Sequence, residues 1–599
     1  MEETILGMQA AGTQATAKHY VGNEQETQRN PSKSKGGKQI LAQSANMDDR
    51  TIHELYAWPF ANSVHAGVAS IMCSYNRLNS TYGCENSKVL NGILKQEMGF
   101  QGYVMSDWGA IHTPKEAVRG GTDMAMPNGF EYLRNDTTPA GSSNETESRI
   151  NDMIVRIMTP YYQLRQDTNF PAIDISSATL GFSQPGSWKY EFNFSTSTQD
   201  VRGDHARLVR EGGAAGAVLL KNVNRTLPLN EPMHVGVFGN GAGDLTKGMY
   251  TMGFDGPANG IYEFGTVPVG GGSGTGRFSY VVTPLDAIKT KVTSYGGIVT
   301  YILDNKDIVA GKLLSDVSPA PNVCLVFLKS WAGESQDRPS LASDWNGDQV
   351  VNKVAAMCKN TVVITHSAGI NIMPWANHPN VTAIIAGHYP GQEIGNSLVD
   401  ILYGEVNPSG RLPYTIAHTE ADYNTDIQNS TALTLTEDAN AWQQQYSEKL
   451  LIDYRYFDAA NKSVLYEFGY GLSYTTFSLS SISVRKTGAA NVTITSAPPA
   501  GRIIQGGLSS LWDVLYTVTA TVSNTGSIDG ATVAQLYVGL TGAPAGTPLR
   551  QLRGFEKVDL SPRQSETVTF SLMRRDISYW DIKVSNESAV TLKHFSNTI

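Results

Sequence analysis

The sequence predicts a multidomain α/β protein that ends in a β-sandwich. Two long regions alternate short apolar strands with amphipathic helices, which is the pattern of parallel sheets. After Trp512 the pattern changes to two-residue alternation in short runs separated by turn residues, which is typical of a sandwich. The length of 599 residues also requires several domains, because single cores stop growing well below this size.

The first β/α region covers roughly the first 130 residues. Four apolar runs that lead into polar loops are predicted strands: Gly12–Tyr20, Gly67–Asn76, Gly102–Trp108 and Gly120–Pro127. Asp48–Ala66 and Ser87–Met98 are predicted helices between them, with Asp48 or Asp49 as the cap of the first. A β/α barrel needs eight such units, so these residues account for only part of one.

The rest of the chain divides into four predicted segments. Ile150–Leu164 has helical spacing and is followed by a linker rich in Ser, Thr, Asn, Pro and Gly. The helix His205–Gly216 then opens the second β/α region. Its predicted strands are Ala217–Lys221, Val235–Phe238, Ile298–Leu303, Val323–Leu328, Thr361–Thr365 and Val381–Ala386. The predicted sandwich strands are Leu515–Val522, Ala531–Val538 and Glu566–Leu572.

The predicted domain boundaries follow from these changes of pattern. They are 1–165 for the partial barrel, 166–204 for the linker, 205–415 for the α/β domain, 416–470 for a connecting segment and 471–599 for the sandwich.

Composition excludes two classes of partner. The chain has 46 Lys and Arg against 55 Asp and Glu, a net charge of -9, so it lacks the basic excess of a nucleic-acid-binding protein. It also contains no apolar run of about 18 residues, so we expect no membrane span.

The four cysteines form two close pairs in the sequence, Cys73 with Cys84 and Cys324 with Cys358. They form either two disulfides, which would imply an oxidising compartment, or four buried free thiols. Asn-X-Ser/Thr sequons favour a glycosylated, secreted protein. They begin at Asn79, Asn135, Asn144, Asn193, Asn224, Asn380, Asn429, Asn461, Asn491 and Asn586. The residues after Met1 do not resemble a signal peptide, so we expect the front of the protein to be missing.

Polar residues directly after the predicted strands are candidates for chemistry, because active sites of β/α barrels lie at that end. Asp107 is a candidate nucleophile, metal ligand or helix cap. Lys18 and His19 could donate hydrogen bonds to sugar hydroxyls, or be an exposed lysine and a structural histidine. Trp108 could stack on a sugar face or fill a core.

A second candidate carboxylate lies in the second β/α region. Glu334 follows the predicted strand Val323–Leu328 in a glycine-containing loop, where it could be a proton donor or part of a solvated turn. No metal site is predicted, because His53 and His65 fit no metal-binding spacing. No cofactor is predicted either. Gly239–Gly243 is not followed by an amphipathic helix, and Val269–Gly276 lacks the Gly-Lys-Ser/Thr of a phosphate loop.

Several motifs together resemble fungal β-glucosidases of glycoside hydrolase family 3. In the first region they are Ala17–Tyr20, Ile71–Asn76, Val104–Trp108 and Gly121–Pro127. In the remainder they are Ala217–Asn222, Gly272–Gly274, Pro390–Glu393, Asn407–Pro413, Asp453–Phe457 and Phe468–Thr475. The resemblance spans nearly the whole chain.

The resemblance implies a fold and a set of site residues. The fold is an incomplete (β/α)8-type barrel, then an α/β sandwich, then a fibronectin-III-like domain, with the active site between the first two. Asp107 matches the nucleophile in Ser-Asp-Trp, and Glu334 matches the acid/base in a pattern like Glu-Gly-x-Asp-Arg, with Ser335 in place of Gly. The implied sugar-binding residues are Lys18, His19, Met72, Tyr75, Trp108 and Ser273. The cysteine pairs match disulfides of the family.

The implied activity is that of a retaining exo-β-glucosidase. Its substrates would be terminal β-D-glucosyl residues of cellobiose and β-glucan oligosaccharides, in cellulose degradation outside the cell, without a metal or cofactor. The alternatives are a β-xylosidase or other family-3 exo-glycosidase, and an inactive truncated remnant that binds sugar. A homodimer is compatible with this interpretation.

The resemblance also implies a missing part. In the family, two more sugar-binding residues precede the Lys-His motif. One is an Asp in a Gly-Pro-x-Gly-like loop and the other an Arg in a Gly-Arg-x-x-Glu-like segment. Only 17 residues precede Lys18 here. We therefore expect the N-terminal part of the catalytic barrel to be absent. Activity on an aryl β-glucoside, compared between this chain and one with the barrel restored, separates an enzyme from a remnant.

Overall fold

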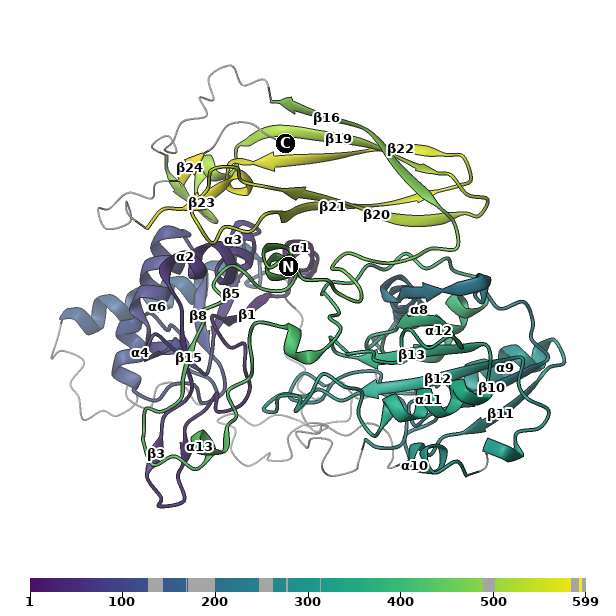
Figure 1. Cartoon of the computed structure of the whole chain (residues 1–599). Helices are drawn as coiled ribbons and strands as arrows, with labels where there is room; N and C mark the ends of the chain where they lie inside the picture. The colour runs from purple at the N-terminus through teal and green to yellow at the C-terminus, as the bar shows by residue number, and fades with distance from the viewer. Residues whose placement is uncertain are drawn as a thin grey trace.

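The structure is a computed structural model that describes residues 1–127, 144–168, 170, 200–246, 262–275, 278–312, 314–487, 501–582 and 592–594. Figure 1 shows three bodies. An N-terminal α/β body and a central α/β body lie side by side, and a C-terminal β-sandwich extends across both. Most of the predicted linker 166–204 and the sequons at Asn135, Asn193, Asn491 and Asn586 lie outside the described residues.

The N-terminal body is built on three parallel strands in the order β1-β5-β8. They are β1 (Thr16–Tyr20), β5 (Ser70–Cys73) and β8 (Tyr103–Ser106). Every residue of β5 is buried, as expected of a central strand covered on both faces. The three strands match the first three strands expected from the sequence, and their carboxyl ends meet at one edge.

Helices cover these strands. They are α1 (Glu2–Ala10), α2 (Asp49–Thr51), η1 (Ile52–Tyr56), α3 (Trp58–His65), η2 (Gly83–Glu85), η3 (Lys88–Glu97), α4 (Pro114–Gly120) and α6 (Asn144–Gln163). Asp48 is the cap of α2, because its carboxylate accepts a hydrogen bond from the Thr51 amide at 2.8 Å. Val89, Leu90, Ile93 and Leu94 of η3 are buried in the core of this body. None of the helices in the described part of the chain is long and apolar enough to cross a membrane.

The fourth strand expected in this region, over Gly120–Pro127, is wrong. Helix α4 extends to Gly120, and Gly121 ends it in a left-handed conformation with φ 115°. Only Met124 then makes a single parallel bridge, to Met105 of β8. The apolar run predicted to be a strand is therefore a helix end followed by a short extended segment.

The connecting segment 416–470 returns to the N-terminal body. Its strand β15 (Gln443–Gln445) pairs in parallel with β4 (Ser44–Asn46), and Tyr446 is buried in the core of that body. The remaining elements of this sheet are β6 (Arg77–Leu78) and β7 (Thr81–Tyr82), and a small hairpin joins β2 (Ser32–Lys33) to β3 (Gln39–Ile40). The segment also carries η8 (Glu420–Asp422), α13 (Thr431–Thr434) and α14 (Tyr454–Ala459).

The central body is a six-stranded sheet in the order β11-β10-β12-β13-β14-β9, parallel except for β9 at the edge. The strands are β9 (Val218–Asn222), β10 (His234–Phe238), β11 (Ile298–Ile302), β12 (Val323–Ser330), β13 (Thr361–Ser367) and β14 (Val381–Ala386). The helices are α8 (His205–Gly216), α9 (Pro284–Ser294), α10 (Asn305–Val309), α11 (Gly347–Met357) and α12 (Ile394–Leu402), with the short turns η5 (Val223–Arg225) and η7 (Leu314–Asp316). Two apolar cores form, one on each face of the sheet.

The C-terminal body packs β16-β19-β22 against β20-β21 around one apolar core. The strands are β16 (Phe477–Lys486), β19 (Val514–Asn524), β20 (Gly530–Val538), β21 (Gln551–Leu560) and β22 (Ser565–Met573). Smaller elements are β17 (Ile503–Ile504), β18 (Gly507–Leu508), η9 (Ser509–Trp512), η10 (Arg574–Ile577), β23 (Ser578–Trp580) and β24 (Leu592–His594). Strands β16 and β21 did not stand out in the sequence. β16 has no buried residue and β21 has a run of three exposed ones, so neither alternates regularly.

Both cysteine pairs are disulfides. Cys73–Cys84 ties the end of β5 to η2 with a separation of 11 residues, and Cys324–Cys358 ties β12 to the end of α11 with a separation of 34. The free-thiol alternative is therefore excluded in this structure.

The two disulfides should differ in their contribution to stability. The longer loop closed by Cys324–Cys358 constrains the unfolded chain more, so we expect its removal to cost about 4 kcal/mol and removal of Cys73–Cys84 about 3 kcal/mol. Denaturant unfolding of the two double Cys→Ala variants measures both free energies. A larger loss for the Cys73–Cys84 variant would contradict the prediction.

Candidate active site

The carboxyl ends of β1, β5 and β8 bring together residues far apart in the sequence. His19 lies in β1, Tyr75 follows β5 by two residues, and Asp107 directly follows β8. Nε2 of His19 lies 3.4 Å from Oδ2 of Asp107, and the Tyr75 hydroxyl is also hydrogen-bonded to Asp107. This edge is where β/α proteins carry their active sites.

Asp107 is not a helix cap. Its Oδ1 accepts a hydrogen bond from the Trp108 amide at 2.8 Å, but the next helix, α4, begins only at Pro114, with Thr113 before it. The Asp107 side chain is buried. Asp107 is thus held by His19 and Tyr75 rather than by a helix end, which is the environment of a carboxylate placed to react.

The other predicted binding residues differ in exposure. Trp108 is 52% exposed, so a ring face is free to stack on a ligand. Lys18 is exposed, and Met72 is buried within β5. Five of the predicted binding residues therefore come from the same strand ends as Asp107: Lys18, His19, Met72, Tyr75 and Trp108.

Two side chains beside Asp107, those of His19 and Tyr75, have pKa values shifted from their ordinary values. Burial lowers the pKa of His19, and the charges of Lys18 and Arg29 add to this, although Asp107 opposes it. Burial and the Asp107 carboxylate raise the pKa of Tyr75. At neutral pH His19 is therefore uncharged and Tyr75 keeps its proton, so both can act as hydrogen-bond donors.

Glu334 reaches this site from the central body, on the loop after β12. Its Oε2 accepts hydrogen bonds from the Ser273 amide at 2.7 Å and the Ser273 hydroxyl at 2.6 Å. Its Oε1 accepts one from Arg29 at 2.8 Å. Both Asp107 and Glu334 act electrostatically on Tyr75 and on His19, so the two carboxylates converge on the same side chains. The alternative of a freely solvated turn is excluded.

The contact between Ser273 and Glu334 requires a glycine beside it. Gly272 has φ 114°, and a Cβ there would lie 2.4 Å from Cβ of Glu334. Neighbouring Gly271 pairs with Gly333 in a parallel bridge. The glycine-rich segment therefore supports Glu334 directly and is not a phosphate loop.

Arg29 is the residue that sequence reasoning missed. Its guanidinium lies 4.4 Å from the centre of the Tyr75 ring and pairs with both Glu26 and Glu334, at 3.1 and 2.8 Å. The side chain is only 8% exposed. It therefore links the residues around Asp107 to the opposite carboxylate. The only signal in the sequence is its place in a polar run, Asn23–Arg29, soon after the Lys-His motif.

The loop after β1, which carries Arg29, and the loop after β12, which carries Glu334, are joined by hydrogen bonds from backbone amides. The amides of Glu26 and Thr27 donate to Asp337 at 3.0 and 2.7 Å, and the Ser335 amide donates to Glu26 at 2.7 Å. Each loop thus offers a carboxylate to the backbone of the other. Because charged acceptors make the stronger hydrogen bonds, this exchange fixes the two bodies against each other at the site.

A buried lysine, Lys329, holds the segment that precedes Ser273. Lys329 near the end of β12 donates hydrogen bonds to the carbonyls of Tyr262 and Gly265, both at 2.6 Å, and lies 4.8 Å from the Trp345 ring. Burial lowers its pKa to about 7. It holds the segment that leads to Ser273, and the sequence showed it only as one charge in an apolar strand.

The charge state of Glu334 follows from these contacts. Partial burial by itself would raise its pKa, but the hydrogen bonds from Ser273 and Arg29 outweigh burial and lower the pKa to about 2. In this arrangement Glu334 is therefore ionised across the range from mildly acidic to neutral pH.

Two carboxylates from separate α/β bodies, with an exposed tryptophan and neutral donors around them, define the site of a glycoside hydrolase. The comparisons agree. Residues 1–159 match the N-terminal domain of glycosyl hydrolase family 3, residues 217–474 match its C-terminal domain, and residues 532–591 match a fibronectin type III-like domain. The chain belongs to glycosyl hydrolase family 3.

Similar proteins cover nearly all of the chain. It is 54% identical to "Probable beta-glucosidase G" of Aspergillus flavus over 98% of this chain and 73% of that protein. It is 44% identical to "Probable beta-glucosidase M" of Aspergillus niger over 97% of this chain and 72% of that protein. Among solved structures, "Beta-D-glucoside glucohydrolase from Trichoderma reesei" superposes with a TM-score of 0.82 at 36% identity, covering 100% of this chain and 77% of that one. "Beta-glucosidase D2-BGL" of Chaetomella raphigera gives a TM-score of 0.82 at 39% identity, covering 98% and 77%.

Removing the Ser273 hydroxyl should raise the pKa of Glu334. Ser273→Ala loses one of the two hydrogen bonds at Oε2 and keeps the amide. A carboxyl group whose pKa is lower in the folded protein than in the unfolded chain stabilises the fold. This stabilisation is fully present above the pKa of the unfolded chain and is lost as the pH falls through the pKa of the folded protein, near 2. In the variant the folded pKa is higher, so this loss should be smaller and should be complete at a higher pH. An infrared titration of the carboxyl band, with Glu334→Gln as the subtraction, measures the shift.

Ser335→Ala is the matched control, because the Ser335 hydroxyl accepts from Arg29 and makes no hydrogen bond to Glu334. An unchanged Glu334 titration in Ser273→Ala, or an equal shift in the control, would contradict the assigned cause.

Proposed function

We propose that this protein is a retaining exo-β-glucosidase that removes terminal non-reducing β-D-glucosyl residues from cellobiose and β-glucan oligosaccharides. The observation that carries the proposal is the convergence of Asp107 and Glu334 on Tyr75 and His19. A retaining enzyme needs two carboxyl groups on either side of the scissile bond, one as nucleophile and one as acid and base. The names of the relatives, all β-glucosidases or a β-glucoside glucohydrolase, support glucose rather than xylose as the sugar.

Asp107 is the proposed nucleophile. Its carboxylate attacks the anomeric carbon as the glycosidic bond breaks, giving a covalent glycosyl-enzyme. His19 and Tyr75 hold the carboxylate, so the attacking oxygen keeps its position during the reaction. The exposed face of Trp108, next in the chain, provides a surface for the sugar ring.

Glu334 is the proposed acid and base. In the second step it takes a proton from water, which attacks the anomeric carbon and releases Asp107. The ionised state held by Ser273 and Arg29 suits this step. The first step needs Glu334 with its proton, to give to the leaving oxygen. Entry of the substrate therefore has to displace one of these donors and raise the pKa of Glu334.

Lys18 and Ser273 complete the proposed sugar subsite, with Met72 as a buried part of its floor. Lys18 is exposed at the same strand end as His19 and can donate to a sugar hydroxyl. Secretion, and a part in cellulose degradation outside the cell, are proposed with this activity. The two disulfides support an oxidising compartment. A homodimer stays a prediction.

Asp107→Asn should abolish turnover of an aryl β-glucoside, with a loss of at least about a thousandfold, because the amide cannot attack. The assay is release of the aryl alcohol, with the wild-type chain measured alongside. Asp123→Asn is a less suitable control, since Asp123 holds Lys95 and Arg149 in the core. Asp244→Asn, an exposed change in the central body, is preferred. Retained turnover in Asp107→Asn would contradict the assignment.

Glu334→Gln should discriminate between leaving groups. Loss of the general acid costs about a hundredfold or more for a poor leaving group and much less for an acidic phenol that leaves without help. The comparison is kcat/KM for an alkyl and a nitrophenyl β-glucoside with the same variant. An equal loss on both would show that Glu334 is not the acid, and absence of turnover by the wild-type chain would favour the sugar-binding alternative.

A further inference from the structure

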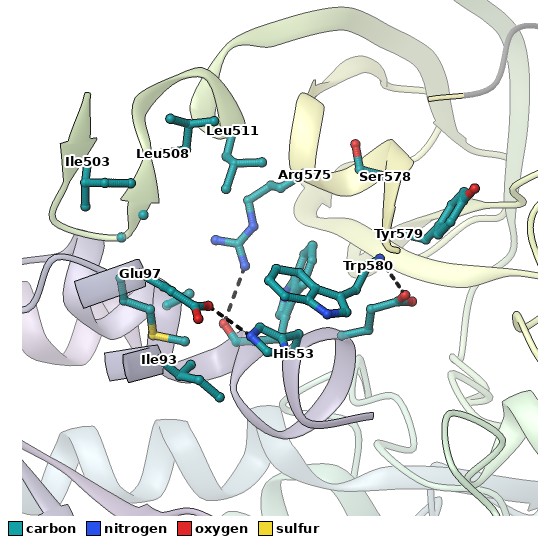
Figure 2. A pocket seen from close by; sticks show the side chains of 16 residues that line it. His53, Ile93, Glu97, Ile503, Leu508, Leu511, Arg575, Ser578, Tyr579 and Trp580 are labelled. Carbon is teal, nitrogen blue, oxygen red and sulfur yellow. Dashed lines mark hydrogen bonds and ion pairs between the residues drawn. The ribbon is translucent and has the colours of Figure 1, made fainter. Parts of the chain in front are cut away.

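A cavity of about 120 Å³ lies between the N-terminal body and the C-terminal sandwich. Figure 2 shows helices η1 and η3 on one side and the β17–β18 hairpin with β23 on the other. None of its lining residues belongs to the site described above. It is therefore a separate cavity at the contact between two bodies.

The walls of the cavity are mainly apolar. Ile93 and Met98 line it from the N-terminal body, and Ile503, Leu508 and Leu511 line it from the sandwich. In Figure 2 these last three side chains lie opposite Ile93 across the central space. An apolar cavity of about 150 Å³ holds benzene. At about 120 Å³ this cavity is somewhat smaller, so a single six-membered ring is the largest ring system it could take, with small shifts of its wall side chains.

Arg575 is the charged group that extends toward this space (Figure 2). It is only 7% exposed and lies 3.9 Å from the Trp58 ring and 4.4 Å from the Trp512 ring. Its hydrogen bonds go to neutral oxygens, the Asn62 amide at 2.6 Å and the Trp58 carbonyl at 3.4 Å. Within the described part of the chain, no carboxylate forms an ion pair with it. Burial lowers its pKa to about 10, so it is charged at neutral pH.

The two acids that line the cavity are paired with other side chains. Glu54 pairs with Arg50 at 2.6 Å, and Glu97 contacts His53 at 3.0 Å on the more exposed rim. A second buried guanidinium, that of Arg553, lies 4.5 Å from the Trp58 ring. One further acid, the half-buried Asp576, acts electrostatically on both Arg553 and Arg575, so these two guanidinium groups share this carboxylate. A second anion would compensate the remaining positive charge. A buried arginine is well suited to a carboxylate, because its planar fork matches the two oxygens.

We propose that this cavity binds a small single-ring aromatic carboxylate. The ring occupies the space between Ile93 and Leu508, and the carboxylate accepts hydrogen bonds from Arg575. Neutral rings lack the charge that Arg575 requires, and short aliphatic acids lack the apolar area that the walls would bury.

Titration of benzoate into the full chain tests the proposal, with tryptophan fluorescence and calorimetry as readouts. We expect saturable binding at one site. Benzyl alcohol, which keeps the ring without the charge, and acetate, which keeps the charge without the ring, should each bind at least about tenfold more weakly. Absence of saturable benzoate binding would overturn the proposal, and so would equal binding of either comparison compound.

Two variants locate the binding. Leu508→Phe places a larger side chain in the cavity wall, keeps Arg575 in the sequence and should weaken benzoate binding at least about tenfold. Leu549→Phe, on an exposed leucine of the same sandwich, should leave it unchanged. Arg575→Met should also weaken it, if the variant folds as judged by circular dichroism. Benzoate binding that survives Leu508→Phe lies elsewhere, and that result would overturn the proposed site.

Discussion

The ion pair between Arg29 and Glu334 is the contact on which the site depends. Arg29 comes from the loop after β1 and Glu334 from the loop after β12, so their 2.8 Å contact joins two separately packed bodies. Arg29 also lies over Tyr75, which is hydrogen-bonded to Asp107. The Arg29 guanidinium therefore contacts Glu334 directly and Asp107 through Tyr75, and so helps to set the position of both carboxylates. The hydrogen bonds to Asp337 and Glu26 on either side keep the loops from moving independently.

This linkage has a chemical consequence. The contacts that position Glu334 also stabilise its ionised form, which is the form needed to activate water and not the form that protonates a leaving group. In the proposed mechanism, the placement of Glu334 and the proton that it needs for the first step are therefore in conflict in the free protein. A substrate that inserts between Glu334 and its donors would resolve the conflict, because loss of a hydrogen bond to the charged form raises the pKa.

Much of this could be predicted from the sequence, for identifiable reasons. The strands of the central sheet are continuous apolar runs because they are buried on both faces, and Asp107 was found because it directly follows such a run. The motifs of the family pointed to Glu334 as the candidate acid and base. Arg29 could not be found, because its burial depends on a partner about three hundred residues away. For the same reason, the pairing of β15 with β4 and the cavity at Arg575 come only from the packing of distant segments.

Asp107 and Glu334 are proposed to form one retaining site in which Asp107 carries the sugar. A 2-deoxy-2-fluoro-β-glucosyl fluoride tests this directly, because its fluorine at carbon 2 slows both steps while the fluoride at carbon 1 leaves readily, so the covalent intermediate accumulates. Mass spectrometry of the digested protein then locates the sugar. We expect one added sugar per chain, on the peptide that contains Asp107. Turnover of an aryl β-glucoside with the label on another residue, or without any label, would contradict it.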